Sequence, residues 1–502
     1  MIICSLFFVT GCIKQDKKGN MSTIKLNFSE GDPPSLHPFY LSPYLRGRTL
    51  AKMLFEGLTR FNQKGEVELS GAKSVSISDS KKEYTFTLRE NYWSNGEKVT
   101  AFQYEKAWKE VLSPSSPCLR TDLLYVLKNG QAVKKSLLSV DEVGVKAIDE
   151  KTLFVELEYP APYFLELVTH PLFLPFVEPE ASIFNGPFTL DEWRHNDLLS
   201  LMPNPFFWDR EHVYIDRIEI TMVRSPETFL ALFEKNEIDW IGEPFCTIEP
   251  EMTFQTPMKS ANSSRFFSIY LNTSYFPLSS SHIRKALSLG LDRQTICDHI
   301  LIGDTPLYTP LPSLLSSIDP LIENATAAKE SFLAGLEELH LSKEDFPVLL
   351  LNCFSSAANR TLAQYLKDRW ESLFGIKIEL ECTDWTTFND KINSGGFQIG
   401  GFFSTPLFFD PLDPLANYSD IFTFSKTWNN SIFREIIQDI YKQALFFERK
   451  QLVCEAEKIL NEETPIIPLV NHRFLYNHNP KLKDFVITKD NQLDLRWAYM
   501  EQ

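Results

Sequence analysis

The fold class is most evident in residues 347–414, PVLLLNCFSSAANRTLAQYLKDRWESLFGIKIELECTDWTTFNDKINSGGFQIGGFFSTPLFFDPLDP. Apolar runs alternate along it with two helical patterns, an order that predicts a parallel sheet with helices on its faces. In open sheets of this kind, ligands bind beyond the carboxyl ends of the strands. We therefore take the loop after Phe403 as the first candidate for a binding site. The apolar runs cover 348–351, 376–381 and 397–403, and the helical patterns cover 359–374 and 385–393.

The composition is that of a globular protein with an acidic surface. The chain has 502 residues, of which 43% are hydrophobic and 23% charged, so we expect two or three domains with ordinary cores. Fifty Lys and Arg residues against 66 Asp and Glu give a net charge of -16. This charge repels phosphate backbones, so nucleic acid is not expected as a partner. No run of 18 apolar residues follows the N-terminal segment, so no membrane-spanning helix is expected.

The first twenty residues have the pattern of a lipoprotein signal. A short apolar stretch, Ile2 to Thr10, leads into Gly11-Cys12 and then into a polar segment, 14–20. The glycine lets a peptidase approach, and the thiol of Cys12 can be alkylated by lipid, as in a bacterial lipobox. A frayed apolar N-terminus is the alternative, because the stretch is short and no Lys or Arg precedes it. We expect Cys12 to be the lipid attachment site and the only membrane contact of the chain.

Six further cysteines have no spacing typical of a metal site or a redox motif. In an exported protein one or two disulfides are open to them, but we expect buried free thiols. They are Cys118, Cys246, Cys297, Cys353, Cys382 and Cys454.

The chain carries none of the local motifs that mark many enzymes. It has no nucleophile elbow, His-Glu-x-x-His zinc site, phosphate loop or dinucleotide fingerprint. The glycines at 395, 396, 400 and 401 have the wrong spacing for a phosphate cradle, and we expect them to let two backbones approach closely. A triad assembled from distant positions stays open, but we expect no enzymatic activity, metal or cofactor.

The remaining patterns predict a mixed α/β chain with two lobes. Alternation predicts a strand at 84–88, and Thr100 with Gln103 forms a capping box for a helix. Extended segments near 265–272 and 464–474 are expected to cross between the lobes.

A set of short motifs runs through the chain from about residue 24 to the C-terminus. The motifs are Ser35-Leu36-His37-Pro38, Phe55-Glu56-Gly57-Leu58, Leu88-Arg89-Glu90, Trp93-Ser94-Asn95-Gly96, Asn185-Gly186-Pro187-Phe188, Asn204-Pro205-Phe206-Phe207-Trp208-Asp209, Glu237-Ile238-Asp239, Arg284-Lys285-Ala286-Leu287, Leu291-Asp292-Arg293 and the segment from Ala456-Glu457 to Pro468. In this order the set resembles the extracellular solute-binding proteins of family 5, in particular the oligopeptide-binding members that serve bacterial ABC importers.

The resemblance implies an α/β fold of the bilobal periplasmic-binding-protein type, class II, with an extra small α+β domain. It divides the chain into a lipoprotein signal and linker, a discontinuous main domain of lobe 1, the extra domain of lobe 1, and lobe 2. The signal and linker cover 1–20. The main domain of lobe 1 covers 21–48, 180–264 and 470–502, the extra domain covers 49–179, and lobe 2 covers 265–469.

The resemblance also implies a function in import. Such a protein captures a short peptide in the hinge cleft between its lobes and delivers it to the permease subunits of an ABC importer. Ligand favours the closed state because both lobes contact it only there. We expect a monomer on the periplasmic side of the inner membrane or at the cell surface, held by a lipid. The alternatives are the same fold binding another small solute, such as a modified or thiol peptide, a metal chelate or a short sugar, and a surface peptidase.

The family's ligand contacts can be carried over one position at a time. Asp32 lies in the first loop, where an acidic residue faces the ligand, and His170 matches a pocket histidine, with a structural histidine as the alternative. Trp385 matches a tryptophan that walls a side-chain pocket. The crossing strand, the end of the run 397–403 and the loop after it supply the other candidates. These are Tyr270, Asn272, Gly401, Phe402, Phe403, Ser404, Thr405 and Asp410.

The chain departs from the family in this last loop. The oligopeptide binders usually have an Arg, a Trp and an Asp near the positions of Gly401, Ser404 and Leu407, and that Asp pairs with the free amino group of the peptide. This chain has none of the three. A buried ammonium without a carboxylate is costly. Either Asp410 or Asp413 therefore replaces the missing acid, or the ligand is not held by a free α-amine.

Overall fold

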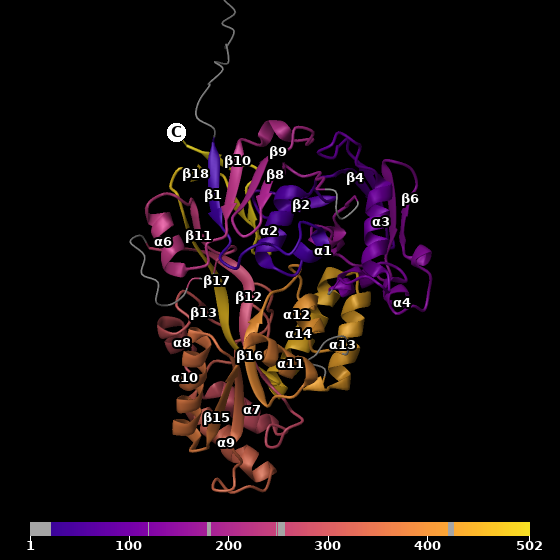
Figure 1. The fold of residues 1–502 in the computed structure, drawn as a ribbon. Helices are drawn as coiled ribbons and strands as arrows, with labels where there is room; N and C mark the ends of the chain where they lie inside the picture. The colour runs from indigo at the N-terminus through magenta and orange to yellow at the C-terminus, as the bar shows by residue number, and fades with distance from the viewer. Residues whose placement is uncertain are drawn as a thin grey trace, which may run out of the picture.

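Two lobes joined by two long strands make up the protein (Figure 1). The computed structural model describes residues 22–118, 120–177, 182–246, 248, 257–419 and 426–501, so the predicted signal and Cys12 lie outside the described residues. Strands β12 (Lys259–Leu271) and β17 (Ile466–His478) pair antiparallel and run from one lobe into the other. The predicted crossing segments are confirmed. Both strands are longer than expected. For β12, the part that lies in lobe 1 is polar and carries no hydrophobic pattern.

Lobe 2, the lower half in Figure 1, contains the stretch that decides the fold class. Its sheet has the order β11-β17-β12-β16-β14-β15, with β13 on the side of β17. Strand β14 pairs parallel with both β15 and β16, which confirms the predicted parallel arrangement. The strands and helices of the stretch are β14 (Leu349–Phe354), α10 (Ala357–Phe374), β15 (Ile378–Thr383), α11 (Trp385–Ser394) and β16 (Ile399–Ser404).

The helices of this stretch end where the sequence supplies caps. The hydroxyl of Ser356 accepts a hydrogen bond from the amide of Asn359 and starts α10, and the carboxylate of Asp384 caps α11 in the same way. Gly375 and Gly395 close the two helices with φ of 67° and 76°, a left-handed conformation that glycine adopts without strain. These local signals explain why the element order could be predicted.

Lobe 1, the upper half, contains a four-stranded sheet and a separate small sheet. The main sheet has the order β1-β10-β9-β8, and the small sheet has the order β4-β5-β7-β6. Helix α3 (Ala101–Leu112) covers the small sheet and carries the predicted capping box of Thr100 and Gln103. We call residues 72–173, which hold this sheet and its helices, the small-sheet region. The strands are β1 (Thr23–Asn27), β8 (Phe188–Arg194), β9 (Leu198–Pro203), β10 (Arg217–Thr221), β4 (Ala72–Ile77), β5 (Glu83–Leu88), β6 (Val145–Ala147) and β7 (Thr152–Glu156).

The other elements surround these sheets. Those of lobe 1 are α1 (Pro38–Leu41), α2 (Leu45–Leu54), β2 (Thr59–Phe61), β3 (Val67–Leu69), η1 (Thr121–Val126), α4 (Gly130–Lys134), η2 (Val140–Glu142), α5 (Phe164–Leu167), η3 (Pro171–Phe173), η4 (Arg210–His212), α6 (Pro226–Glu234), β11 (Trp240–Gly242), β18 (Leu482–Lys483), β19 (Val486–Ile487), β20 (Leu493–Asp494) and β21 (Tyr499–Met500). Those of lobe 2 are α7 (Ser281–Leu289), α8 (Arg293–His299), β13 (Thr305–Pro306), α9 (Ala325–Glu338), α12 (Leu412–Ala416), α13 (Ser431–Lys442) and α14 (Phe446–Glu463).

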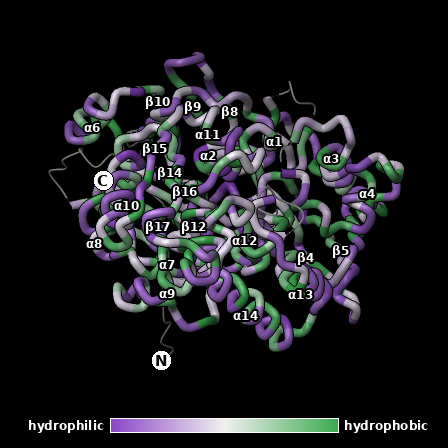
Figure 2. The backbone as a smooth tube through the Cα atoms, turned by 90° about the horizontal axis from the view of Figure 1, so that it is seen from below, coloured by the Kyte–Doolittle hydropathy of each residue, from purple (hydrophilic) through white to green (hydrophobic). Residues whose placement is uncertain are grey.

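The two lobes touch along one side of the molecule. Two views agree that α13 lies beside the small-sheet region (Figure 1, Figure 2). The rings of Tyr159 and Tyr441 meet there, with centroids 5.0 Å apart. One apolar core cluster accordingly includes both small-sheet residues and members of α12, α13 and α14, whereas the parallel strands and α10 belong to a second cluster.

One expectation about the cysteines is wrong. Cys353 and Cys382 form a disulfide, because the parallel register of β14 and β15 places the two residues opposite each other. Cys118, Cys246, Cys297 and Cys454 are free thiols, as expected.

In the ranges that the structure describes, no helix is long and apolar enough to cross a membrane. Among the same residues, no group of three or more His, Cys, Asp or Glu side chains could hold a metal ion.

Candidate functional site

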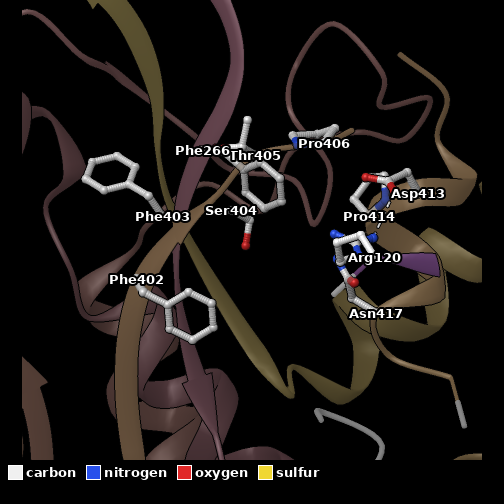
Figure 3. Close-up of a pocket in the computed structure, with 10 residues that line it drawn as sticks. All are labelled: Arg120, Phe266, Phe402, Phe403, Ser404, Thr405, Pro406, Asp413, Pro414 and Asn417. Atoms are coloured by element: carbon white, nitrogen blue, oxygen red, sulfur yellow. Dashed lines mark ion pairs between the residues drawn. The ribbon is translucent and has the colours of Figure 1, made fainter. Parts of the chain in front are cut away.

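A cavity of about 190 Å³ lies beyond the carboxyl end of β16, where the sheet topology predicts a ligand. Its wall combines the end of β16 and the start of α12 from lobe 2, Phe266 from the crossing strand β12, and Arg120 from the small-sheet region (Figure 3). Both lobes therefore contribute to one cavity. The lining residues are Arg120, Phe266, Phe402, Phe403, Ser404, Thr405, Pro406, Asp413, Pro414 and Asn417.

The alternation of β16 positions the aromatic walls. Phe402 and Phe403 point to opposite sides of the strand (Figure 3). Phe402 stacks on Tyr270, with ring centroids 4.6 Å apart, and Phe403 packs edge-on against Phe267 at 5.0 Å. A Cβ at Gly401 would come within 2.7 Å of the Phe267 ring. Glycine is therefore needed there to make room for a side chain, and not for a second backbone as we expected.

Asp413 and Arg120 are the charged groups of the cavity. One carboxylate oxygen of Asp413 accepts a hydrogen bond from the amide of Leu407 at 3.0 Å, and the other lies 4.0 Å from Arg120. Arg120 is closer to Asp122, to which it donates two hydrogen bonds of 2.9 and 3.0 Å. Burial raises the pKa of Asp413 to about 6, although Arg120 and the Leu407 amide oppose the shift. Asp413 is thus a buried carboxylate with a distant counter-charge.

Asp410, the other acid of this loop, has a partner of its own. Its two oxygens accept hydrogen bonds of 2.6 and 2.8 Å from the guanidinium of Arg449 on α14. The amide of Leu412 donates a third at 2.9 Å. Asp410 therefore anchors the loop to α14 and is absent from the cavity wall.

Two predicted residues of the crossing segment, Tyr270 and Asn272, make different kinds of contact. The hydroxyl of Tyr270 lies 3.0 Å from that of Ser404, which points toward the centre of the cavity in Figure 3. The side chain of Asn272 donates hydrogen bonds to the backbone oxygens of Gly395 and Phe397, at 3.0 and 2.9 Å. Tyr270 thus supports the cavity from behind, and Asn272 fixes the turn before β16.

Asp32, His170 and Trp385 do not line this cavity. Asp32 accepts hydrogen bonds from the indole of Trp193 at 3.1 Å and the amide of Asn196 at 2.8 Å, which joins the first loop to the β8–β9 turn. His170 is 2% exposed and caps η3. Trp385 is 55% exposed and packs edge-on against Phe354. Of the candidates carried over from the family, the structure brings Phe402, Phe403, Ser404 and Thr405 together at the cavity.

The lobes close over the cavity through the loop between β16 and α12. The amide of Phe409 donates a hydrogen bond of 2.6 Å to the carboxylate of Glu166 in the small-sheet region. Phe408 stacks on Tyr163, with centroids 4.8 Å apart. Burial raises the pKa of Glu166 to about 7. These contacts join the two lobes directly, so the structure has a closed cleft.

Three residues that reach this region from other parts of the chain were not predicted from the sequence. Arg120 and Phe266 line the cavity, and Glu166 joins the two lobes beside it. None of them stands in a motif, and each reaches the site from a segment at least 130 residues away from the loop. The presence of Asp413 in the loop was the one signal that the sequence offered for the charged part of the site.

Comparison with known families and proteins adds a second line of evidence. The model of the bacterial extracellular solute-binding proteins, family 5 Middle, matches residues 66–426. The oligopeptide-binding protein OppA of Bacillus subtilis is 31% identical to the chain, over 97% of the chain and 94% of OppA. The dipeptide-binding protein DppE of the same organism is 27% identical, over 89% of the chain and 86% of DppE.

Solved structures share the fold over nearly the whole chain. OppA of Haemophilus influenzae in complex with the peptide RPPGFSPFR superimposes with a TM-score of 0.80 at 22% identity, covering 96% of this chain and all of that one. The substrate-binding domain of an oligopeptide ABC transporter from Bacillus anthracis superimposes with a TM-score of 0.78 at 24% identity, covering 96% and 99%. The likeness confirms the predicted bilobal α/β fold with an extra small domain.

Proposed function

Because the chain belongs to the bacterial extracellular solute-binding proteins of family 5, we propose that it is the substrate-binding component of an ABC importer. It captures short peptides in the cleft between its lobes and delivers them to a membrane permease. One observation carries this function: both lobes line a single cavity at the carboxyl end of β16 and close over it. A ligand held in this way stabilises the closed state, which is the state that the permease must recognise.

We propose that Asp413, and not Asp410, binds the free amino group of the peptide. Asp410 is paired with Arg449 at 2.6 Å, whereas the nearest cation of Asp413 among the described residues is 4.0 Å away. An ammonium bound beside Asp413 would neutralise the buried carboxylate. The carboxylate would in turn offset the cost of burying the ammonium. The chain would thereby replace the acid that the family's oligopeptide binders have near the position of Leu407.

The aromatic wall would serve the side chains of the ligand. Phe402, Phe403 and Phe266 offer apolar surface, and the hydroxyls of Ser404 and Thr405 offer hydrogen bonds that do not depend on one side chain. An extended peptide also carries its own backbone donors and acceptors, so one cavity can accept many sequences. Tyr270, which stacks on Phe402, and Gly401, which leaves room for the ring of Phe267, would support this wall.

The domain bounds remain a proposal that the sheets support. The small sheet falls inside 49–179, the main sheet of lobe 1 falls inside 21–48 and 180–264, and the parallel strands fall inside 265–469. Strands β12 and β17 cross the proposed borders at 264 and 469, where a hinge would lie.

The lipid anchor is the proposed link to the membrane, with Cys12 as the attachment site. A Cys12→Ser variant expressed in a bacterium should move from the membrane fraction to the soluble fraction. Membrane association that survives this substitution, or a mature chain that still carries residues 1–11, would refute the anchor.

Native mass spectrometry of the protein as purified tests the function itself. We expect bound masses that match a mixture of short peptides, and a higher melting temperature after defined tripeptides are added to stripped protein. A single non-peptide mass would favour another small solute. Stoichiometric binding without cleavage of the added tripeptides would exclude a peptidase.

A further inference from the structure

The turn between α13 and α14 exposes three consecutive apolar side chains. Leu445, Phe446 and Phe447 are 56%, 78% and 78% exposed, and no other large apolar side chain in the part of the chain that the structure describes is as exposed as the two phenylalanines. We call residues 443–448 the α13–α14 tip. An apolar centre with a polar rim is typical of a protein–protein contact. The exposed charged residues of the rim are Lys442, Glu448 and Lys450.

These apolar side chains do not serve the helix that they begin. Leu445 is the N-cap of α14 and makes no side-chain hydrogen bond, and Phe446 and Phe447 are the first two helical residues. The neighbouring helix α13 has the usual polar cap, because the side chain of Asn430 accepts a hydrogen bond of 2.9 Å from the amide of Phe433. A departure from such a local rule is expected at a functional position.

The tip lies between two contacts with the small-sheet region of lobe 1. Before the tip, the ring of Tyr441 meets that of Tyr159, with centroids 5.0 Å apart. After the tip, the guanidinium of Arg449 lies over the ring of Tyr163, 5.4 Å from its centroid. The tip therefore stands where the closed lobes meet, with α13 and α14 beside the small-sheet region (Figure 1).

The second of these contacts is connected to the ligand cavity. Arg449 donates hydrogen bonds of 2.8 and 2.6 Å to the carboxylate of Asp410. Asp410 belongs to the loop between β16 and α12, which lines the cavity and joins lobe 1 through Phe408 and Phe409. A continuous set of packed and hydrogen-bonded contacts therefore runs from the cavity through this loop to the tip.

The surroundings of the tip differ between a closed and an open protein. In the closed structure, the tip is next to lobe 1, where Glu158 and Pro162 are exposed beside the two tyrosines in the chain. When the lobes move apart, Tyr441 and Arg449 separate from Tyr159 and Tyr163, so the tip no longer adjoins lobe 1. A partner that binds the tip and lobe 1 together therefore binds the closed state in preference to the open one.

We propose that the α13–α14 tip, with the adjoining surface of the small-sheet region, is the docking point for the permease of the importer, and that Phe446 and Phe447 enter an apolar recess on its extracytoplasmic face. This inference rests on the proposed function and names the surface of the chain through which delivery takes place. The position favours the permease over a second copy or a membrane, because delivery requires a partner that selects the loaded, closed protein.

Uptake and binding, measured side by side, test the docking point. Phe446→Ser combined with Phe447→Ser removes the apolar centre and leaves the cavity residues in place. Leu333→Ser is the matched control, at a 63% exposed side chain of α9, at the far end of lobe 2 (Figure 1). We expect wild type and both variants to bind Ala-Ala-Ala with the same affinity. In cells whose only copy of the protein is the variant, the double variant should lower protein-dependent uptake of labelled Ala-Ala-Ala about 10-fold or more, and the control should not.

A photo-crosslinking amino acid gives a second measurement that does not depend on how the double variant folds. Benzoylphenylalanine in place of Phe446 should crosslink to a permease subunit, identified by mass spectrometry, and more strongly when Ala-Ala-Ala is present. The same amino acid in place of Leu333 should give no such product. Crosslinks to a second copy of the chain or to lipid, without permease, would refute the docking point and indicate self-association or membrane insertion.

The outcomes separate the docking point from the function on which it rests. Wild-type uptake that the double variant retains would refute the docking point alone. A weaker affinity of the double variant for Ala-Ala-Ala would also refute it, because the tip would then serve closure of the cleft. If wild-type protein neither binds nor imports Ala-Ala-Ala, the proposed function fails together with the docking point.

Discussion

Two clusters of charged groups lie at the junction of the lobes, one at the hinge and one at the cavity, and they are paired very differently. At the hinge, His472 on β17 lies 2.9 Å from both Glu243 of lobe 1 and Asp304 of lobe 2. Arg265 on β12 adds an ion pair of 3.1 Å to Glu243. At the cavity, the carboxylate of Asp413 is 4.0 Å from its nearest described cation, Arg120, which is itself paired with Asp122 at 2.9 Å.

The difference indicates which charges serve the fold and which wait for a ligand. Buried charges persist only when they are paired, because desolvation is costly. The hinge cluster meets this condition within the protein and therefore fixes the crossing strands. The carboxylate of Asp413 in the cavity does not, so the ammonium of a peptide would complete it.

The largest expected effect is on the hinge. Replacing His472 with Asn leaves Glu243 and Asp304 buried without their shared cation, and should lower the free energy of unfolding by about 3–5 kcal/mol. Chemical denaturation measures this loss. Unfolding of the variant at the wild-type denaturant concentration would show that the hinge charges contribute nothing.

The same histidine predicts a pH dependence of stability. Although burial opposes it, the charge of Glu243 and the hydrogen bonds to both carboxylates raise the pKa of His472 to about 9, above its unfolded value near 6.5. The protonated ring therefore stabilises the fold fully below about pH 6.5, and this contribution is lost as the pH rises through 9. Denaturation at pH 6.5 and pH 9.5 should show the decrease in wild type and a smaller one in His472→Asn.

The next effect is on ligand affinity. Asp413→Asn should weaken the binding of Ala-Ala-Ala by about 2–5 kcal/mol, because the peptide ammonium loses a buried carboxylate. N-acetyl-Ala-Ala-Ala should bind both proteins equally, since it carries no ammonium. Asp410→Asn is an unsuitable control because it breaks the ion pair with Arg449, and Asp122→Asn would break the ion pair with the cavity residue Arg120. Asp390→Asn, at an exposed acid of α11 outside the cavity wall, is the matched variant. An unchanged affinity of Asp413→Asn for the free-amine peptide would contradict the amine site.

The smallest effect concerns cleft closure by Glu166. Its carboxylate accepts the Phe409 amide across the cleft, but burial raises its pKa to about 7, so closure at pH 8 carries the cost of a buried charge. Glu166→Gln keeps an acceptor without the charge and should raise peptide affinity two- to fivefold, about 0.4–1 kcal/mol, at pH 8. A lower affinity would show that the charge itself is needed for closure.

The Glu166→Gln protein also isolates the titration of Asp413. The pKa of Asp413 in the ligand-free site is about 6, and a bound ammonium lowers it. Affinity for Ala-Ala-Ala should therefore be constant above about pH 7 and fall by up to tenfold per pH unit below pH 6. The N-acetylated peptide should show no such decrease. Equal pH profiles for the two peptides would refute the assignment.

The sequence predicted those parts of the fold that depend on local signals. The alternation of apolar runs and helical patterns in residues 347–414, with caps such as Ser356 and Gly375, specifies the parallel strands and their helices. The loop at the end of β16 could be predicted as a ligand site for the same reason. The disulfide could not, because the register that places Cys353 opposite Cys382 depends on how two strands pair and not on their spacing.

The charged part of the site depends on packing between distant segments. Arg120 and Glu166 come from lobe 1, and in the closed structure they meet a loop near residue 410. No single-chain pattern marks them, since each has the surroundings of an ordinary surface residue in the sequence. For the same reason, only some of the residues carried over from the family line the cavity. Ser404 and Thr405 line it, whereas Asp32 and Trp385 lie elsewhere in the closed structure.

The most direct test compares the two clusters by thermal unfolding, with and without Ala-Ala-Ala. We expect Asp413→Asn to melt near the wild-type temperature without peptide and to lose most of the shift that peptide causes. We expect His472→Asn to melt at a clearly lower temperature and to keep that shift. The reverse pattern, in which the hinge variant loses the peptide shift and the cavity variant keeps it, would show that Asp413 does not hold the ligand.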